Sequence, residues 1–312
     1  MRIIENLKDF PKDQYSVVTS GTFDGVHFGH QEILHRVVQT AKDHNGLSSV
    51  LTFWPHPRFV LSKDSTDLKL LTTFQEKAQL IEKAGIDFIV KIPFTKEFSK
   101  YSSSRFIEEI LVEGLNLNKL VIGYDHRFGR NREGSFEYLK ENSSQLGFEV
   151  EEIPEQDIDD IAVSSTKIRE ALLAGDIKTG NEYLGRSYSI KGTIIEGEKI
   201  GRKIGYPTAN IHVDESYKLI PGDGIYAVRS TIEESAYDGM LYIGPRPTLN
   251  GQHRSIEVNL FDFDRDIYGK EIEIQFIEAI RKDAKFENLE QLSQQLNKDK
   301  EIALKLLSAT SH

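Results

Sequence analysis

The sequence contains no cysteine. Disulfide bonds and thiolate metal sites are therefore excluded, and the absence fits a cytoplasmic protein. No apolar run approaches the roughly 20 residues that a membrane span needs, and residues 1–13 lack the apolar core of a signal peptide. We therefore expect a globular, soluble and cytoplasmic protein with no membrane partner.

Positive charge is scarce as well, because 39 lysines and arginines face 49 aspartates and glutamates, a net charge of −10. This balance argues against a general nucleic-acid-binding surface. An anionic ligand would have to be held by local donors and metal ions. With 312 residues, the chain is long enough for about two domain cores. The sequence does not identify protein partners, and self-association stays open.

The first part of the chain alternates short apolar strands with helical patterns, which is typical of a parallel α/β sheet. We predict strands at Ser16–Thr19, Val50–Phe53, Phe88–Ile92, Lys119–Gly123 and Phe148–Ile153. Thr73 and Glu76 form a predicted capping box for a helix that ends at Gly85, and another helix is expected over Ser104–Glu113, before Gly114. Ligands of such sheets lie at the carboxyl ends of the strands, so the segments that follow the strands are candidate sites.

The first strand leads into a glycine-rich turn and a helix, with the sequence GTFDGVHFGH over residues 21–30. The glycines let a phosphate chain approach closely, next to a helix N-terminus. His27 and His30 lie three residues apart, so they share one helical face and can donate to the same phosphate oxygens. The other candidate nucleotide-binding residues of the turn are Gly21, Phe23, Asp24, Gly25 and Gly29.

This turn allows two other interpretations. Its spacing is neither GxGxxG nor GxxxxGK[ST], which disfavours a dinucleotide fold and a P-loop. The two histidines could ligate zinc, but without cysteine the remaining ligands would have to be Asp24, His56 or Asp125.

Three further segments follow predicted strands. In TFWPHP, two prolines are expected to stop any helix and to hold His56 in a rigid turn. In GYDHRFGRNREG, Asp125 stands near three arginines. In AVSSTKIREALLAG, a short helix begins with Ser164, Ser165 and Thr166, and Arg169 follows one turn later, which favours a phosphate site. The plain alternatives are a packed aromatic loop, a solvated basic loop and a simple helix cap.

These motifs, in this order and spacing, resemble the adenylyltransferase half of prokaryotic bifunctional FAD synthetases, the riboflavin kinase/FMN adenylyltransferase family. The resemblance implies a Rossmann-like nucleotidyltransferase domain in which His27 and His30 are catalytic. It implies contacts of His56 and Pro57 with the flavin. The nucleotide would be bound by Asp125, Ser164, Ser165, Thr166 and Arg169.

From about Tyr188 the pattern changes to short alternating segments broken by Gly, Pro and Asn, which indicates an antiparallel β-barrel. The predicted strands are Ser189–Ile195, Gly224–Ser230, Gly239–Ile243, Ser255–Phe261 and Ile272–Ala279. A terminal helix is expected over Leu289–Leu307, and a linker near Asn181–Arg186. We therefore divide the chain into domains 1–183 and 184–312.

The barrel region carries a second set of motifs. In GEKIGRKIGYPTAN, the glycines Gly197, Gly201 and Gly205 suggest a flap over ATP phosphates, and a plain glycine-rich hairpin is the alternative. The Thr208 hydroxyl and the Asn210 carbonyl are hard oxygen ligands suited to Mg²⁺. PTAN resembles the riboflavin kinase signature.

The segment SIEVNLFDFDRDIYGKEI resembles the kinase segment whose glutamate acts on the ribityl hydroxyl. Glu257 lies between Ile256 and Val258, so its side chain should point to the opposite face of the strand. Asn259 departs from the family, which more often has an aromatic residue or histidine there. Arg281 matches the family's arginine after the last strand and is a candidate flavin contact.

The resemblance covers nearly the whole chain and implies an Mg²⁺-dependent bifunctional enzyme. One half would phosphorylate riboflavin to FMN with ATP, and the other would join FMN to AMP from ATP to make FAD. In one alternative, only the adenylyltransferase is active and the barrel is a degenerate flavin-binding or regulatory module. In the other, the whole chain is a flavin-sensing binding protein without enzymatic activity.

Overall fold

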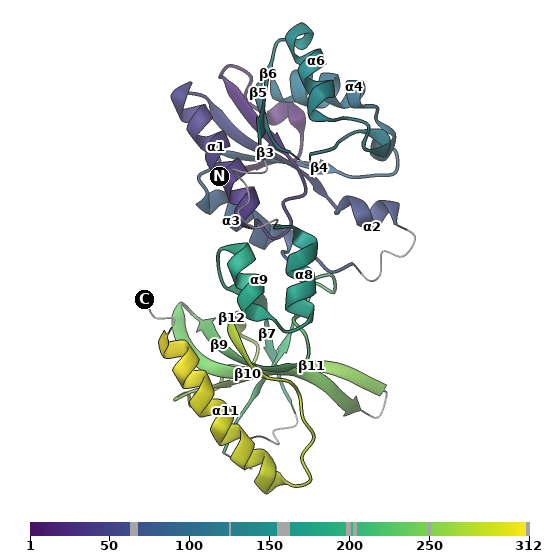
Figure 1. Ribbon diagram of the computed structural model, residues 1–312. Helices are drawn as coiled ribbons and strands as arrows, with labels where there is room; N and C mark the ends of the chain where they lie inside the picture. Colours follow the sequence, from purple (N-terminus) through teal and green to yellow (C-terminus); the bar gives the residue numbers. More distant parts are fainter. Residues whose placement is uncertain are drawn as a thin grey trace. The chain divides into compact units, whose positions relative to one another are not determined.

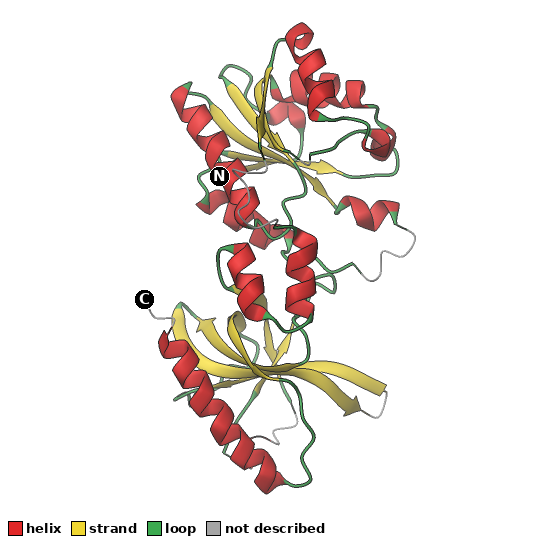
Figure 2. Ribbon diagram, viewed as in Figure 1, coloured by secondary structure: helices red, strands yellow, loops and turns green. Residues whose placement is uncertain are grey.

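The computed structural model describes residues 1–62, 68–124, 126–154, 163–197, 201, 205–248 and 251–309. The chain forms two compact units, Met1–Ser164 and Ser165–His312, and each is described by itself below (Figures 1 and 2). The division at 183/184 expected between the two catalytic halves stays a prediction. In the part of the chain that the structure describes, no helix combines the length and apolarity needed to cross a membrane.

The first unit is built on a parallel sheet of six strands in the order β1-β4-β3-β2-β5-β6. The strands are β1 (Arg2–Ile4), β2 (Ser16–Ser20), β3 (Leu47–Trp54), β4 (Phe88–Pro93), β5 (Leu117–Gly123) and β6 (Glu149–Ile153). The predicted parallel sheet and its five strands are confirmed. β1 was missed because only Ile4 of its three residues is buried, so it carries little apolar signal.

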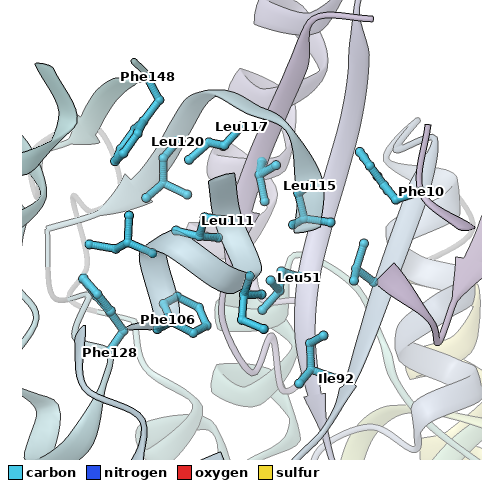
Figure 3. Close-up of a cluster of buried hydrophobic side chains, with 14 of the residues drawn as sticks. Phe10, Leu51, Ile92, Phe106, Leu111, Leu115, Leu117, Leu120, Phe128 and Phe148 are labelled. Carbon is cyan, nitrogen blue, oxygen red and sulfur yellow. The ribbon is translucent and has the colours of Figure 1, made fainter. Parts of the chain in front are cut away.

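Alternate residues of the strands face two separate cores, as expected for a sheet covered on both sides. Val17 packs with apolar residues of helices α1 (Phe28–Asp43) and α3 (Phe74–Lys83). The neighbouring Val18 packs on the other face, in the cluster shown in part in Figure 3. That cluster includes Phe106 and Leu111 of the helical run 103–115 and Leu139 of α6 (Phe136–Leu146).

Two predicted helix boundaries in this unit were wrong. The helix expected to stop before Gly114 continues through it as α4 (Ser103–Arg105), a π-helix (Phe106–Val112) and α5 (Glu113–Leu115). It ends at Asn116, whose left-handed φ of 47° closes the helix. The prolines of TFWPHP do not stop every helix either. Pro57 occupies the first turn of α2 (Pro57–Leu61), where proline needs no N–H partner.

The second unit is a closed barrel of six strands in the order β10-β11-β8-β7-β12-β9, followed by a long helix. Its elements are α8 (Ser165–Leu173), α9 (Ile177–Leu184), β7 (Tyr188–Ile195), β8 (Ala209–His212), β9 (Gly224–Ile232), β10 (Ser235–Thr248), β11 (Gly251–Leu260), β12 (Glu271–Arg281) and α11 (Leu289–Ala309). All barrel pairings are antiparallel, so the predicted barrel and terminal helix are confirmed. The first unit also contains short 3-10 helices, which span Leu7–Asp9, Phe98–Lys100 and Arg130–Arg132.

Two elements of the second unit differ from the expectation. α9 covers much of the predicted linker, and the Asn181 amide joins it to the barrel by donating to the Phe276 carbonyl at 2.9 Å. β8 was not predicted, because its four residues, which begin within PTAN, include only one buried apolar side chain, Ile211. Its pairing with β11 places Asn210 opposite Glu257.

Candidate functional sites

The glycine-rich turn after β2 adopts a backbone that most side chains avoid. Phe23 has a φ of 48°, Gly25 of 84° and Val26 of 40°. Left-handed backbone costs about 1–3 kcal/mol for a residue other than glycine and persists only where the surroundings enforce it. The contacts of Asp24 provide that enforcement.

Asp24 is 4% exposed and fastens the turn to the segment that precedes α3. Its carboxylate accepts hydrogen bonds from the Leu71 N–H at 3.0 and 3.1 Å and from the Thr72 N–H at 3.1 Å. The Gly25 N–H donates in turn to the Thr72 hydroxyl at 3.1 Å. The carboxylate therefore stabilises the strained turn, and contact of Asp24 with a nucleotide remains a prediction.

His27 and His30 lie together, as the three-residue spacing predicts. Their rings stack with centroids 3.7 Å apart and an interplanar angle of 19°. The Phe23 ring packs against His30 at 4.9 Å. A Cβ at Gly21 would lie 3.1 Å from that Phe23 ring, so glycine leaves the room that the aromatic side chain needs. Gly29 is buried in the first turn of α1.

Lys77 is a buried cation beneath the same turn, and the sequence analysis did not single it out. It is 4% exposed, and its ammonium donates to the Thr22 carbonyl at 3.0 Å and to the Thr52 hydroxyl at 3.2 Å. Burial lowers the pKa of Lys77 from its ordinary 10.5 to about 8, while the Asp24 charge acts in the opposite direction. The signal was present in the sequence, since Lys77 stands four residues before buried Ile81 on the apolar stripe of α3.

Of the other site residues predicted in the first unit, the structure describes His56 and Pro57 but not Asp125. His56 is the N-cap of α2, and its Nδ1 accepts from the Arg58 N–H at 3.2 Å. Pro57 follows it at the start of that helix. Asp125 lies outside the described residues. Within the described ranges, no three His, Asp or Glu side chains gather as a metal-binding group.

The motif SSTKIR lies where the two compact units divide. Ser164 closes the first unit, and Ser165 begins both α8 and the second unit. Thr166 and Arg169 are in the first turns of α8, as expected for a helix N-terminus. Their approach to the histidine pair remains a prediction.

In the second unit, Glu257 points away from the barrel interior. Its neighbours Ile256 and Val258 are 8% and 1% exposed, so they form the inner face and Glu257 lies on the other, as predicted. The Thr208 hydroxyl donates to one carboxylate oxygen at 3.2 Å, and the Ser255 hydroxyl donates to the other at 3.2 Å. Asn210 is its direct partner across β8 and β11, so both side chains lie on one face.

The glycines of the predicted flap are explained by close contacts at two positions. A Cβ at Gly197 would lie 2.0 Å from the Asn210 amide nitrogen, so only glycine lets that amide fold over the backbone. A Cβ at Gly201 would lie 2.1 Å from the Tyr206 carbonyl oxygen. Gly205 has a φ of 80°. These contacts bring the described parts of the segment next to Asn210 and Tyr206.

Asn259 has a structural contact in this unit. Its amide donates to the Pro207 carbonyl at 2.7 Å, which holds the PTAN segment against β11. An open cleft of about 600 Å³ begins beside this contact. Its lining comes from residues 205–207, from the end of β11 with the loop that follows it, and from helix α11. It comprises Gly205, Tyr206, Pro207, Asn259, Leu260, Phe261, Asp262, Phe263, Asp264, Ser293, Asn297 and Lys300.

Tyr242 joins the Glu257 face and was missed by the sequence analysis. It pairs with Glu257 across β10 and β11, and its hydroxyl donates to Asp283 at 3.3 Å. Burial, followed by the nearby Asp283 charge, raises the pKa of Tyr242 to about 12. The alternation of β10 was visible in sequence, but the register that brings Tyr242 opposite Glu257 was not.

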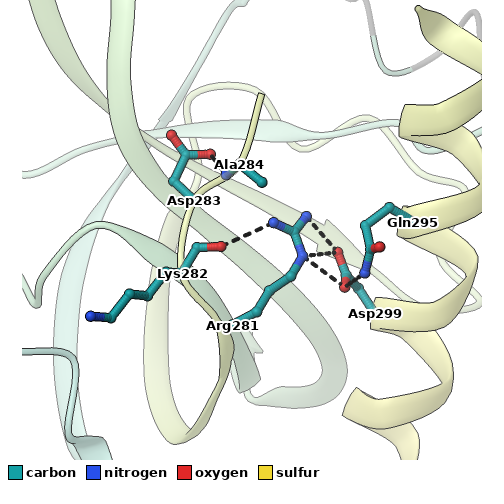
Figure 4. Close-up of polar contacts among 6 residues, drawn as sticks. All are labelled: Arg281, Lys282, Asp283, Ala284, Gln295 and Asp299. Atoms are coloured by element: carbon teal, nitrogen blue, oxygen red, sulfur yellow. Dashed lines mark hydrogen bonds and ion pairs between the residues drawn. The ribbon is translucent and has the colours of Figure 1, made fainter. Parts of the chain in front are cut away.

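Arg281 is engaged with helix α11, as Figure 4 shows. Its guanidinium donates to both oxygens of Asp299 at 2.8 to 3.1 Å, and Asp299 is completely buried. Gln295 donates to the same carboxylate at 2.9 Å. The arginine thus joins the last strand to the terminal helix, and its contact with a flavin stays a prediction.

Comparison with known proteins assigns one family to each part of the chain. A family model described as FAD synthetase matches residues 9–167, and one described as riboflavin kinase matches residues 184–307. Three curated relatives carry the name bifunctional riboflavin kinase/FMN adenylyltransferase. The protein from Listeria monocytogenes is 40% identical (93% of this chain, 91% of that protein), that from Bacillus subtilis 37% (94% and 93%) and that from Escherichia coli K12 31% (99% and 98%).

A crystal structure from Streptococcus pneumoniae has the same fold. It is 31% identical, with a TM-score of 0.88 over 96% of this chain and 97% of that one. That protein is named a macrolide-efflux protein, a name that differs from both family models and from the curated relatives. The likeness therefore supports the architecture, while the two family models match the two sets of motifs separately.

Proposed function

The chain belongs to the family of bifunctional riboflavin kinase/FMN adenylyltransferases, and on that premise we propose that it makes FMN and FAD in two steps. The barrel unit transfers the γ-phosphoryl group of ATP to the 5′-hydroxyl of riboflavin and releases ADP. The Rossmann-like unit transfers the adenylyl group of a second ATP to the FMN phosphate and releases pyrophosphate. Both reactions move anionic groups, so positioned donors supply most of the catalysis.

In the adenylyl transfer, the stacked pair His27 and His30 stabilises the charge that develops on the α-phosphate as pyrophosphate leaves. The pair starts α1, whose N-terminal N–H groups add a favourable dipole. Ser165 and Arg169, in the first turns of α8, bind the remaining phosphates of ATP. His56 and Pro57 contact the flavin.

In the phosphoryl transfer, Glu257 orients the ribityl hydroxyl and accepts its proton as the new O–P bond forms. The hydroxyls of Thr208 and Ser255, each 3.2 Å from a carboxylate oxygen, fix the orientation of this base. Thr208 and Asn210 offer hard oxygen donors beside it, the donor type that Mg²⁺ prefers, so these residues fit the ion. When bound, Mg²⁺ neutralises phosphate charge.

The cytoplasmic location also remains a proposal.

The observation that carries this function is the placement of Glu257, Thr208 and Asn210 on one face of the barrel. A degenerate barrel would have no need to hold a carboxylate by two hydroxyls beside a metal-binding amide. The test is chromatography of the products formed from riboflavin, ATP and Mg²⁺ and, in a second reaction, from FMN, ATP and Mg²⁺. We expect FMN first and FAD later. FAD from supplied FMN without FMN from riboflavin would favour the degenerate barrel, and no product at all would favour the flavin-sensing protein.

A further inference from the structure

Lys77 is in an unusual position for a lysine. It lies one turn after the Thr73 cap of α3 and points beneath the glycine-rich turn. Its ammonium donates to the Thr22 carbonyl at 3.0 Å and to the Thr52 hydroxyl at 3.2 Å. Thr22 follows β2 and Thr52 lies in β3, so the ammonium joins the carboxyl ends of these two strands. The Thr52 hydroxyl itself lies 3.4 Å from the Thr22 oxygen.

This charge is expensive to bury. Lys77 is 4% exposed, and none of the carboxylates in the described ranges forms an ion pair with it. The rings of Trp54 and Phe74 lie 5.7 and 5.6 Å from its ammonium, and Asp24 acts on it only through its field. A methionine or leucine would fill the same space without a desolvation penalty. The unfavourable desolvation of this ammonium therefore indicates a functional role that an apolar side chain could not fill.

The role of Lys77 can be inferred from the peptide group to which it donates a hydrogen bond. The Thr22 carbonyl and the Phe23 N–H belong to one planar trans peptide, so they point in opposite directions. When a cation holds the carbonyl on the interior side, the N–H points the other way and becomes a stronger donor through polarisation. Among the described residues, the Phe23 N–H has no protein acceptor, so it remains available to a ligand.

We propose that Lys77 is a positioning residue for adenylyl transfer, which holds and polarises the Thr22–Phe23 peptide so that its N–H donates to a phosphate group of the bound nucleotide. The inference rests on the proposed function. It assigns a purpose to the left-handed φ of 48° at Phe23, because this conformation turns the chain immediately after the polarised peptide. The motif alone predicts nucleotide binding by Phe23 but does not show what supports its backbone.

The test compares Lys77→Met with Lys77→Arg and with Lys83→Met, which removes an exposed lysine from the same helix. We expect Lys77→Met to lower kcat for FMN adenylylation by about 10-fold or more, since it weakens one preorganised donor without deleting it. The melting temperature of Lys77→Met should not fall, because an apolar side chain replaces a buried charge. Riboflavin phosphorylation in the same variant, and both activities of Lys83→Met, should keep the wild-type rates. Lys77→Arg should recover part of the lost rate.

The outcomes separate the inference from the proposed function. Wild-type protein that makes no FAD from FMN and ATP overturns the function and the inference together. If wild type makes FAD and folded Lys77→Met makes it equally fast, only the inference falls. A lower melting temperature with an unchanged kcat per folded molecule would show a merely structural lysine. If Lys77→Met does not fold, Lys77→Gln, which keeps a donor but no charge, decides the question by the same comparison.

Discussion

The two units hold their central side chains in opposite ways. In the first, a strained turn is fixed from the interior by Asp24 and Lys77, which contact residues 47 and 55 positions away in the sequence. In the second, Glu257 stands in a regular strand and is held by Ser255, two residues away, and by Thr208 on the neighbouring segment. A turn supported by buried charges should lose function through changes at a distance. A carboxylate held by strand register should lose it mainly through direct change.

Glu257→Gln tests the second half of this comparison and should have the largest effect. Glutamine keeps the shape and one acceptor oxygen but cannot accept a proton. General-base help is worth about 10²–10⁴, so riboflavin phosphorylation should fall by that factor. Glu271→Gln removes an exposed glutamate from the start of β12 and serves as the matched control. FAD formation from supplied FMN should be unchanged in both variants, and a wild-type kinase rate in Glu257→Gln would assign the base to another residue.

His30→Ala tests the first half at the proposed catalytic histidine pair. Loss of one preorganised donor commonly costs about 10²–10³ in rate, and FMN adenylylation should fall by that amount while riboflavin phosphorylation persists. The control is His35→Ala, because His35 lies on the same helix and is exposed. The assignment fails if His30→Ala, still folded, loses both activities equally.

The contrast between the units also explains which features could be predicted from sequence. The strand, turn and helix around His27 are encoded locally, by apolar strand residues, glycines and a three-residue spacing. The apolar stripe of α3 includes Lys77 and so indicates its burial, but its hydrogen-bond partners are not encoded locally, because they depend on the packing of α3 against the ends of β2 and β3. Tyr242 was missed for a related reason, since only the pairing of β10 with β11 places it opposite Glu257.

Helix ends show the same limit. Gly114 and Pro57 are residue types that commonly end helices, yet both belong to helices here. A Cβ at Gly114 would lie 3.0 Å from Leu7, so this glycine serves close packing of the helix rather than its termination. Local rules therefore predicted the elements well, and tertiary contacts decided their ends.

Arg281→Met extends the comparison of the two units, because it leaves the buried Asp299 carboxylate of the barrel unit without its charged partner. Asp299 is completely buried, and removing one member of such a pair costs about 3–5 kcal/mol. Since the Arg281 side chain is 20% exposed, we expect the lower end, about 3 kcal/mol. The measurement is the urea concentration at which kinase activity is lost. The double variant Arg281→Met/Asp299→Leu should recover most of the stability. If the double variant is as unstable as the single one, the loss comes from packing of the arginine stem and not from the unpaired carboxylate.

The smallest expected effect concerns the cap of α3, the helix that carries Lys77. The Thr73 hydroxyl accepts from the Glu76 N–H at 3.1 Å, and the Glu76 carboxylate accepts from the Thr73 N–H at 2.8 Å. Thr73→Ala removes the first bond and should cost about 1 kcal/mol of stability. Because α3 also places Lys77 beneath the turn, the variant should lower the rate of FMN adenylylation slightly and leave riboflavin phosphorylation unchanged. A double-mutant cycle with Glu76→Ala measures the coupling, which should be close to zero if the two bonds act independently. A loss of stability with equal adenylylation per folded molecule would show that the cap supports the helix but not the position of Lys77.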